Sequence, residues 1–369
     1  MSDHNKRSGG RPSAERRGRI PGMSIAPEPR QLYIAWARYQ RRPEAMKDAL
    51  NFDLHYIYLE RYHGSRIRTI LRYVLSSILT FRIVVQADPD IVWYQSPPGL
   101  IAHVLVLARL FTSRRFKIVA DLHNAALSKR RWRLLPGATY LLNRSDAVVV
   151  HNDTLLETVK AQGILSPPVV VLNDLPPPVR TATAQSGGGR PLIVMPASLA
   201  KDEPLEIVAE VARLCPDFDF VVTSGRGLRP SDELASAGPS NLSFPPFLPI
   251  RDYDALLARA TAILAITRFD GIQLSAATEA IAFGKPLVIS DTEVLKRLFG
   301  RAAIVTENTP EAIAAACACA VSEPDRYASL ARALRDDAGR RQRWDAQARR
   351  LMSHLQPGLQ ALSPASPRR

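Results

Sequence analysis

The chain has 369 residues, of which 46% are hydrophobic and 23% charged, which excludes a mostly disordered protein and predicts two domains. Three cysteines are too few for a disulfide framework. The formal net charge of +14 is uneven: residues 1–180 hold 27 Lys and Arg against 14 Asp and Glu, and residues 181–369 hold 22 against 21. A basic half joined to a nearly neutral half indicates an anionic partner for the first half.

The N-terminal segment does not predict a targeting sequence. Residues 1–29 are polar and basic with no apolar run behind the charges, so we expect a disordered basic arm. The longest uncharged stretch lies between Asp90 and Arg109, and two prolines and a glycine interrupt it, so it does not predict a membrane-spanning helix. We expect a cytoplasmic protein, peripheral on the inner face of the cell membrane.

From residue 30 onward, the first half alternates short apolar runs with segments of helical periodicity. The expected strands are residues 31–37, 52–60, 90–98, 116–124, 146–152 and 168–174. The expected helices are residues 66–87, 99–111, 138–145 and 153–163. Between the first two strands, residues 38–44 are expected to form a polar loop with Arg38, Arg41 and Arg42.

The second half repeats this alternation after residues 176–190, whose Pro, Gly, Ser and Thr predict a linker. The expected strands are residues 191–198, 218–227, 242–249, 261–270, 286–291 and 302–308. The expected helices are residues 202–216, 251–260, 275–285, 292–300, 309–323 and 324–355.

Strands separated by crossover helices predict parallel sheets covered on both faces. The expected fold class is α/β, with two doubly wound Rossmann-like domains that face each other across a cleft. The expected parts are the arm at 1–29, the first domain at 30–175, the linker at 176–190, the second domain at 191–340, and a C-terminal helix and tail at 341–369 with length enough to cross back to the first domain. Ligands of such sheets bind at the carboxyl ends of the strands, so the cleft is the expected site.

Residues 261–291 carry the clearest chemical pattern. A strand ends at Arg268, and Asp270 and Gly271 form a turn in which glycine permits a close backbone approach. The helix that follows begins with small residues at Ser275, and its free N–H groups and dipole favour a phosphate. One turn further, Glu279 is an acid on an otherwise apolar helix. A carboxylate there can accept hydrogen bonds from both hydroxyls of a ribose.

The segment Glu279-Ala280-Ile281-Ala282-Phe283-Gly284-Lys285-Pro286-Leu287-Val288 resembles the donor-site signature of GT-B glycosyltransferases. The resemblance is strongest to family 4 (group 1), which contains many bacterial polysaccharide enzymes. The resemblance implies the GT-B fold, and it implies that Glu279 binds the ribose of a nucleotide-sugar. The first acid of the signature falls on Gly271, so its neighbour Asp270 is the catalytic candidate in its place.

Further donor-binding candidates follow from the same resemblance. Lys201 and Ser198 stand where the family holds the diphosphate, and Arg226 lies in a Gly-x-Gly turn after the next strand. Each candidate has an ordinary alternative. Lys201 and Arg226 can face solvent, Arg268 can form a salt bridge instead of a donor contact, and Ser275 can be a plain helix N-cap.

The first domain is expected to hold the acceptor. Asp121 and His123 follow a strand and are candidates for a base toward an acceptor hydroxyl, or for ordinary loop residues. Arg38, Ser96 and Gly99 also follow strands and are the acceptor-side candidates, although the prolines beside Ser96 can serve only to shape a turn.

The basic helices of the first domain, with residues 129–133 around Trp132, predict docking on an anionic membrane surface, against the alternative of a solvated basic face. No nucleic-acid-binding signature is present, so no nucleic acid partner is expected. The seven histidines do not cluster, so neither a metal nor another cofactor is expected. This agrees with the resemblance, because GT-B enzymes usually need no bound metal.

The predicted function is transfer of a hexose from a UDP- or GDP-linked sugar to a saccharide acceptor in bacterial exopolysaccharide or lipopolysaccharide assembly, and a lipid-linked acceptor is favoured. The alternative is a catalytically inactive GT-B-like protein that binds a nucleotide-sugar as partner of a membrane polysaccharide assembly. A nucleotide-sugar epimerase on the same fold is a third possibility. Measured turnover of the donor separates them.

Overall fold

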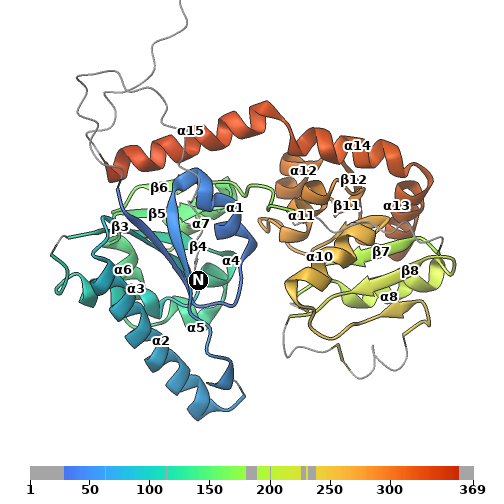
Figure 1. Ribbon diagram of the computed structural model, residues 1–369. Helices are drawn as coiled ribbons and strands as arrows, with labels where there is room; N and C mark the ends of the chain where they lie inside the picture. Colours follow the sequence, from blue (N-terminus) through green and yellow to red (C-terminus); the bar gives the residue numbers. More distant parts are fainter. Residues whose placement is uncertain are drawn as a thin grey trace, which may run out of the picture.

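The computed structural model describes residues 29–62, 64–113, 115–179, 189–199, 201–225, 230–231 and 238–356. They form two α/β domains side by side, with two C-terminal helices along one side of both (Figure 1). The expected basic arm, apart from Pro29, and most of the expected linker lie outside the described residues.

The first domain contains a six-stranded parallel sheet in the order β2-β1-β3-β4-β5-β6. Its strands are β1 (Gln31–Ala35), β2 (Phe52–Tyr56), β3 (Ile91–Ser96), β4 (Lys117–Leu122), β5 (Ala147–Val150) and β6 (Val169–Val171). Its helices are α1 (Arg41–Leu50), α2 (Arg66–Ala87), α3 (Leu100–Ala108), α4 (Asn124–Ser128), α5 (Arg130–Arg133), α6 (Ala138–Asn143) and α7 (Asp153–Ala161), with a 3-10 turn η1 (Glu60–Tyr62).

The second domain repeats the arrangement with the strand order β12-β11-β10-β7-β8-β9, again parallel. Its strands are β7 (Leu192–Met195), β8 (Asp219–Val222), β9 (Leu242–Ser243), β10 (Ala262–Ala265), β11 (Leu287–Ser290) and β12 (Ala303–Thr306). Its helices are α8 (Leu205–Leu214), α10 (Ile250–Arg259), α11 (Ser275–Phe283), α12 (Glu293–Phe299), α13 (Pro310–Ser322) and α14 (Pro324–Arg335). The predicted fold class is confirmed.

The central strands are apolar throughout because helices cover both faces of each sheet. In β1, Ile34 joins the core on one face, while Tyr33 and Ala35 join the core on the other. Because successive side chains point to opposite faces, a strand of this kind supplies both cores at once.

The C-terminal helices join the two domains. The sequence predicts one helix over residues 324–355, but the structure has α14 and a separate α15 (Ala338–Leu355). The helix is interrupted at Asp337, which is the N-cap of α15 and whose side chain accepts a hydrogen bond from the Gly339 N–H. Trp344 and Leu351 of α15 are buried in the core of the first domain, so the chain crosses back there after α14.

The expected polar loop after β1 is wrong in part, because α1 begins at Arg41. Pro43 is tolerated in the first turn of a helix, and Met46 and Leu50 are buried on one face four residues apart. Arg41 and Arg42 therefore stand on a packed helix that points them into the protein.

Helix α2 carries its large apolar side chains on the side facing away from the sheet. This exposed apolar stripe of α2 consists of Ile67, Ile70, Leu71, Val74 and Ile78. The face that packs on the domain buries Ser76, Thr80 and Val84 instead. Among the described helices α2 alone is long and apolar enough to cross a membrane, a criterion that core helices of soluble proteins and signal sequences also meet.

Candidate active site

Side chains of the two domains meet around Glu279, in the second turn of α11. The Glu279 side chain is 5% exposed, and its Oε1 accepts a hydrogen bond of 2.9 Å from Arg41 Nε of the first domain. Its Oε2 accepts a hydrogen bond of 2.5 Å from the Tyr253 hydroxyl of α10. The Arg41 guanidinium also donates from Nη2 to Asp254 Oδ1 at 2.5 Å. One guanidinium thus joins two buried carboxylates across the domain boundary.

This cluster leaves one strong donor unused. Arg41 Nη1 is buried and has no hydrogen-bond partner among the described residues. A buried N–H group without a partner costs free energy, and such groups mark places where a ligand can bind. Because Arg41 stacks over the Tyr253 ring at 5.3 Å, the guanidinium is held in place with this N–H free.

The protonation of the cluster follows from its burial. Burial raises the pKa of Glu279, and the Arg41 charge and the Tyr253 hydrogen bond offset only part of that rise. Burial and the neighbouring Glu279 carboxylate raise the pKa of Tyr253 well above its ordinary value, so its hydroxyl keeps its proton and acts as a donor.

The N-terminus of α11 has no side-chain cap. Its N-cap residue is Leu274, whose side chain cannot accept a hydrogen bond, and Ser275 is exposed as the first helical residue. The expectation that Ser275 serves as the N-cap is therefore wrong. The first N–H groups of α11 are left for a ligand or solvent, and the helix dipole favours an anion there.

The turn before α11 is fixed by structural contacts. Asp270 Oδ1 accepts hydrogen bonds from the N–H groups of Gly271 at 2.8 Å and of Val294 at 3.4 Å, which places it at the start of α12. Burial alone would raise the pKa of Asp270, but these backbone donors together hold it below its usual value. Asp270 is thus engaged with α12, and its catalytic role stays a prediction.

Gly271 needs to be a glycine for two reasons. Its φ is +81°, a conformation that L side chains rarely adopt, and an added Cβ would lie 3.0 Å from Thr154 Cγ2 in the first domain. Its carbonyl oxygen accepts a hydrogen bond of 3.4 Å from Asn152 Nδ2. The turn that carries the donor signature therefore touches the first domain directly.

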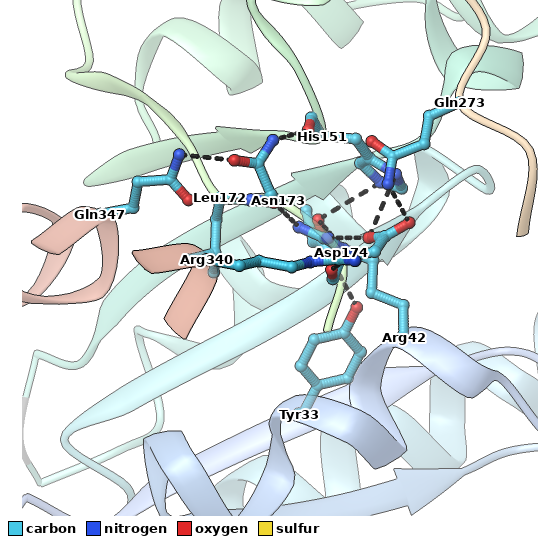
Figure 2. A network of polar contacts seen from close by, with 10 residues as sticks. Tyr33, Arg42, His151, Leu172, Asn173, Asp174, Gln273, Arg340 and Gln347 are labelled. Carbon is cyan, nitrogen blue, oxygen red and sulfur yellow. Dashed lines mark hydrogen bonds and ion pairs between the residues drawn. The ribbon is translucent and has the colours of Figure 1, made fainter. Parts of the chain in front are cut away.

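A second polar cluster lies at the carboxyl edge of the first sheet (Figure 2). Arg42 donates from Nε to Asp121 Oδ2 at 3.0 Å and pairs through Nη1 with Asp174. Tyr33 donates its hydroxyl to Asp121 at 2.7 Å, and His151 Nδ1 lies 3.6 Å from Asp174 Oδ1. Arg42 thus neutralises two acids, Asp121 on β4 and Asp174 in the segment after β6.

This cluster also reaches the other elements of the domain boundary. Gln273 Nε2, in the loop before α11, donates to Asp174 Oδ2 at 3.2 Å, and Arg340 of α15 donates to the Asp174 carbonyl at 3.2 Å. The second domain and the crossing helix therefore converge on one residue at the end of β6.

The charges of this cluster are fixed near neutral pH. Burial alone would raise the pKa values of Asp121 and Asp174, but Arg42 and the neighbouring histidines hold both below their usual range. Burial lowers the pKa of His123 to about 3, helped by the nearby His151, so His123 is neutral at pH 7. Its ring packs against His151 with centroids 4.6 Å apart.

Asp121 is engaged in structural contacts. Its side chain is fully buried, and Arg42 and Tyr33 donate to its oxygens, so its role as a base stays a prediction. His123 Nε2 is buried without a partner in the described part of the chain, and its role as a base stays a prediction.

Comparison with known proteins agrees with this architecture. A family model described as glycosyl transferase-like matches residues 205–353, from α8 into α15. The chain is similar to HepE of Anabaena in complex with UDP-glucose, with TM-score 0.65 and 14% identity over 88% of this chain and 100% of that one. It is also similar to sucrose-phosphate synthase from Thermosynechococcus elongatus, with TM-score 0.63 and 13% identity over 90% and 100%. No curated protein matches the sequence.

The whole chain has the GT-B fold, and residues 205–353 match the glycosyl transferase-like family. The predicted resemblance to GT-B glycosyltransferases and the predicted enzyme class are confirmed. A UDP-forming α,α-trehalose-phosphate synthase from Burkholderia xenovorans also shares the fold, with TM-score 0.59 and 12% identity over 91% of this chain and 100% of that one.

The remaining donor-side candidates are spread along the loops of the second domain. The Ser198 hydroxyl donates to Glu203 at 3.1 Å, and Arg268 pairs with Glu206, as its salt-bridge alternative predicts. Lys201 is exposed. Arg226 lies outside the described residues. Of the three described residues, Ser198, Lys201 and Arg268, none forms a hydrogen bond or ion pair with Glu279.

The acceptor-side candidates are placed differently from one another. Arg38 is exposed beyond β1, while Ser96 is buried at the end of β3. Ser96 and Gly99 line a small cavity of about 30 Å³ beside Trp132. Among the described residues no group of three or more His, Cys, Asp or Glu side chains could hold a metal ion.

Sequence reasoning missed the residues that join the two domains. Arg41 and Arg42 were expected in a polar loop, and Tyr253, Asp254 and Asp174 drew no functional expectation. The available signal was positional, since Arg41 and Arg42 follow β1 and Asp174 follows β6, at strand ends where ligands and partners gather.

Proposed function

We propose that the protein transfers a hexose from a UDP- or GDP-linked sugar, bound by the second domain, to an acceptor bound by the first domain. The observation that carries this is the buried pair of Glu279 and Arg41, whose Nη1 is unpartnered, on a helix whose N-terminus, one turn before Glu279, has no side-chain cap. An acid for a ribose and free N–H donors for a diphosphate are what a nucleotide-sugar needs. That HepE was solved with UDP-glucose supports the same donor class.

In this proposal Glu279 and Arg41 bind different parts of the nucleotide-sugar. A carboxylate has about four lone-pair sites, and Glu279 uses two, so it keeps acceptor capacity for the ribose hydroxyls. Arg41 Nη1 and the N–H groups at the start of α11 stabilise the charge that develops on the leaving diphosphate. Because Arg41 belongs to the first domain, this contact draws the domains together and helps to exclude water.

Titration calorimetry with UDP, GDP and ADP tests the donor site. We expect one nucleotide to bind at micromolar concentration, and Glu279→Gln to weaken it at least tenfold, about 1.4 kcal/mol, because the amide accepts fewer hydrogen bonds. Glu311→Gln, a change on α13 away from the cluster, is the control and should bind like the wild type. A folded protein that binds none of the three, or a variant that binds equally well, contradicts the donor site.

We place the acceptor at the cytoplasmic face of an anionic membrane, as a saccharide or lipid-linked saccharide of polysaccharide assembly. The exposed apolar stripe of α2 supports this, with Ile67 80% and Ile70 65% exposed. Arg66, Arg68 and Arg82 are exposed on the same helix and supply charge for anionic lipid. Because the opposite face of α2 packs on the domain, where Trp36 donates to Thr80 at 2.8 Å, α2 lies along the membrane surface.

Sedimentation with lipid vesicles tests this placement. We expect binding to vesicles that contain phosphatidylglycerol, weakened by salt, and little binding to phosphatidylcholine alone. The triple change Ile67→Ser, Ile70→Ser and Val74→Ser should reduce binding at least tenfold, because each side chain loses apolar area to bury. Leu214→Ser, at an exposed leucine of α8, is the control. Equal binding of the triple variant, or none by the wild type, rules the placement out.

A catalytically inactive nucleotide-sugar-binding protein is the second candidate. It is favoured by Gly271 at the position of the first acid of the signature and by the engagement of Asp270 with α12. Loss of donor that depends on added acceptor supports transfer. Binding of donor without turnover supports the inactive partner, and loss without acceptor supports hydrolysis or epimerisation.

A further inference from the structure

The first domain holds a cavity of about 180 Å³ at the carboxyl ends of β1, β2 and β3, closed by α2 and the α4–α5 segment. Ligand pockets of drug-sized molecules are usually larger, so this cavity fits a smaller group, of the size of one sugar ring. It lies where ligands of parallel sheets bind, and no function described above uses it.

Aromatic rings form a large part of its wall. Trp36, Tyr58, Tyr73 and Trp132 line the cavity. Tyr73 lies between the two indoles, with ring centroids 5.9 Å from Trp36 and 6.3 Å from Trp132. Such amphipathic rings offer a flat apolar surface on which the C–H face of a sugar ring can pack.

The charged residues at this cavity are all basic. Arg72, Lys129 and Arg131 line it, and none of the described residues that line it is acidic. Arg131 stacks over the Trp132 ring at 5.1 Å and Arg72 over Tyr73 at 5.2 Å, so the two guanidinium groups are held beside the rings. Positively charged guanidinium and ammonium groups, next to aromatic rings on which a sugar can pack, favour a sugar that carries a phosphate.

The position of the cavity indicates what carries this phosphate. Arg72 and Tyr73 of α2 line it, while Leu71 and Val74, their chain neighbours, belong to the exposed apolar stripe of α2. On its other side, Trp36 is joined to Arg41 by the connection between β1 and α1, so the same short segment touches both the cavity and the donor cluster. The cavity thus borders the helix that carries the apolar stripe and the segment that leads to the donor cluster.

We propose that this cavity is the acceptor subsite and binds the phosphate-linked sugar of a lipid-linked acceptor, with the lipid chain leaving along the stripe of α2. This rests on the proposed transferase function and names its acceptor class. The aromatic residues bind the sugar ring, and Arg72, Arg131 and Lys129 bind the phosphate. Trp132 also lines the smaller cavity that Ser96 and Gly99 line, so these two predicted acceptor-side residues lie next to the site.

Tryptophan fluorescence of the full chain tests the subsite, because Trp36 and Trp132 line it. The probes are a short-chain polyprenyl diphosphate hexose, a hexose 1-phosphate, the methyl hexoside and inorganic phosphate. We expect the polyprenyl probe to bind at least tenfold more tightly than the hexose 1-phosphate, and the methyl hexoside to bind most weakly. Arg131→Ala should weaken the polyprenyl probe at least tenfold.

The matched control is Arg144→Ala, since Arg144 is also exposed and stacked over a ring, Tyr140, at 5.0 Å, but does not line the cavity. It should change the affinity less than twofold. Equal binding of the polyprenyl probe and hexose 1-phosphate overturns the lipid part of the proposal. If the methyl hexoside binds as tightly as the hexose 1-phosphate, the phosphate subsite is overturned. It is also overturned if the Arg131→Ala variant binds the polyprenyl probe as tightly as the Arg144→Ala variant does.

Nucleotide titration of the same variants separates this proposal from the donor site. Arg131→Ala should leave the affinity for the nucleotide unchanged, because Arg131 does not touch the Glu279 cluster. If no nucleotide binds while the polyprenyl probe still depends on Arg131, the donor proposal fails and the subsite stands. If the nucleotide binds and the probe is independent of Arg131, the subsite fails and the donor site stands.

Discussion

Replacing Arg42 by methionine is expected to lower the free energy of unfolding by about 3–5 kcal/mol. Arg42 is the cation between Asp121 and Asp174, and its removal leaves both carboxylates buried without a counter-charge. The Asp121 side chain has no exposed surface, so water cannot replace the lost partner. Methionine keeps most of the side-chain volume, so the loss reports charge more than packing.

Urea unfolding at pH 7 measures this effect. Arg326→Met is the control, since Arg326 forms an exposed pair with Glu323 on α14 and should change the free energy of unfolding by less than about 0.5 kcal/mol. A loss for Arg42→Met of the same small size would show that Asp121 and Asp174 do not depend on Arg42. The double variant Arg42→Met and Asp121→Asn should recover part of the loss, because it removes one of the stranded charges.

Lowering the pH is expected to destabilise the protein already at pH values well above those at which carboxylates become protonated. Burial lowers the pKa of His123 to about 3, while a histidine in the unfolded chain titrates near 6.5. Between these values the unfolded state binds one more proton than the folded state, so stability is full above about pH 6.5 and falls as the pH falls toward 3. The slope for one such group is about 1.4 kcal/mol per pH unit.

Unfolding midpoints and free energies at pH 7, 6 and 5 test this. Asp121 and Asp174 have lowered pKa values, so their contribution is lost only below about pH 4. Because the raised pKa of Glu279 adds a dependence of opposite sign, the difference between His123→Asn and the wild type reports the histidine. His123→Asn should flatten the pH dependence by about one proton, whereas His354→Asn, at an exposed position on α15, should not. An unchanged slope in His123→Asn would contradict a neutral, buried His123.

Much of the local structure followed from the sequence. Helix α2 has the limits that its periodicity predicts, residues 66–87, and each sheet strand lies within an apolar run of the expected kind. The segment from Glu279 to Val288 also led to the family, because helix, glycine stop and next strand are all encoded within a few neighbouring residues. Local propensity and periodicity suffice for features of this range.

The failures concern residues whose partners are remote in the chain. Asp121 was predicted as a candidate base or an ordinary loop residue, and no local pattern predicts its pairing with Arg42, which is 79 residues away on α1. The helix over residues 324–355 was expected to be continuous, yet it breaks at Asp337, where α15 turns to pack on the other domain.

By itself the sequence determined the two parallel α/β domains, the donor signature on α11 and the excess of positive charge in the first half, because each is a property of local pattern or composition. Only the tertiary structure decided which charges neutralise one another. Arg41 and Glu279 are 238 residues apart, and no local pattern pairs them. Two separately folded sheets must first bring their carboxyl edges together, and burial then makes that pairing energetically necessary.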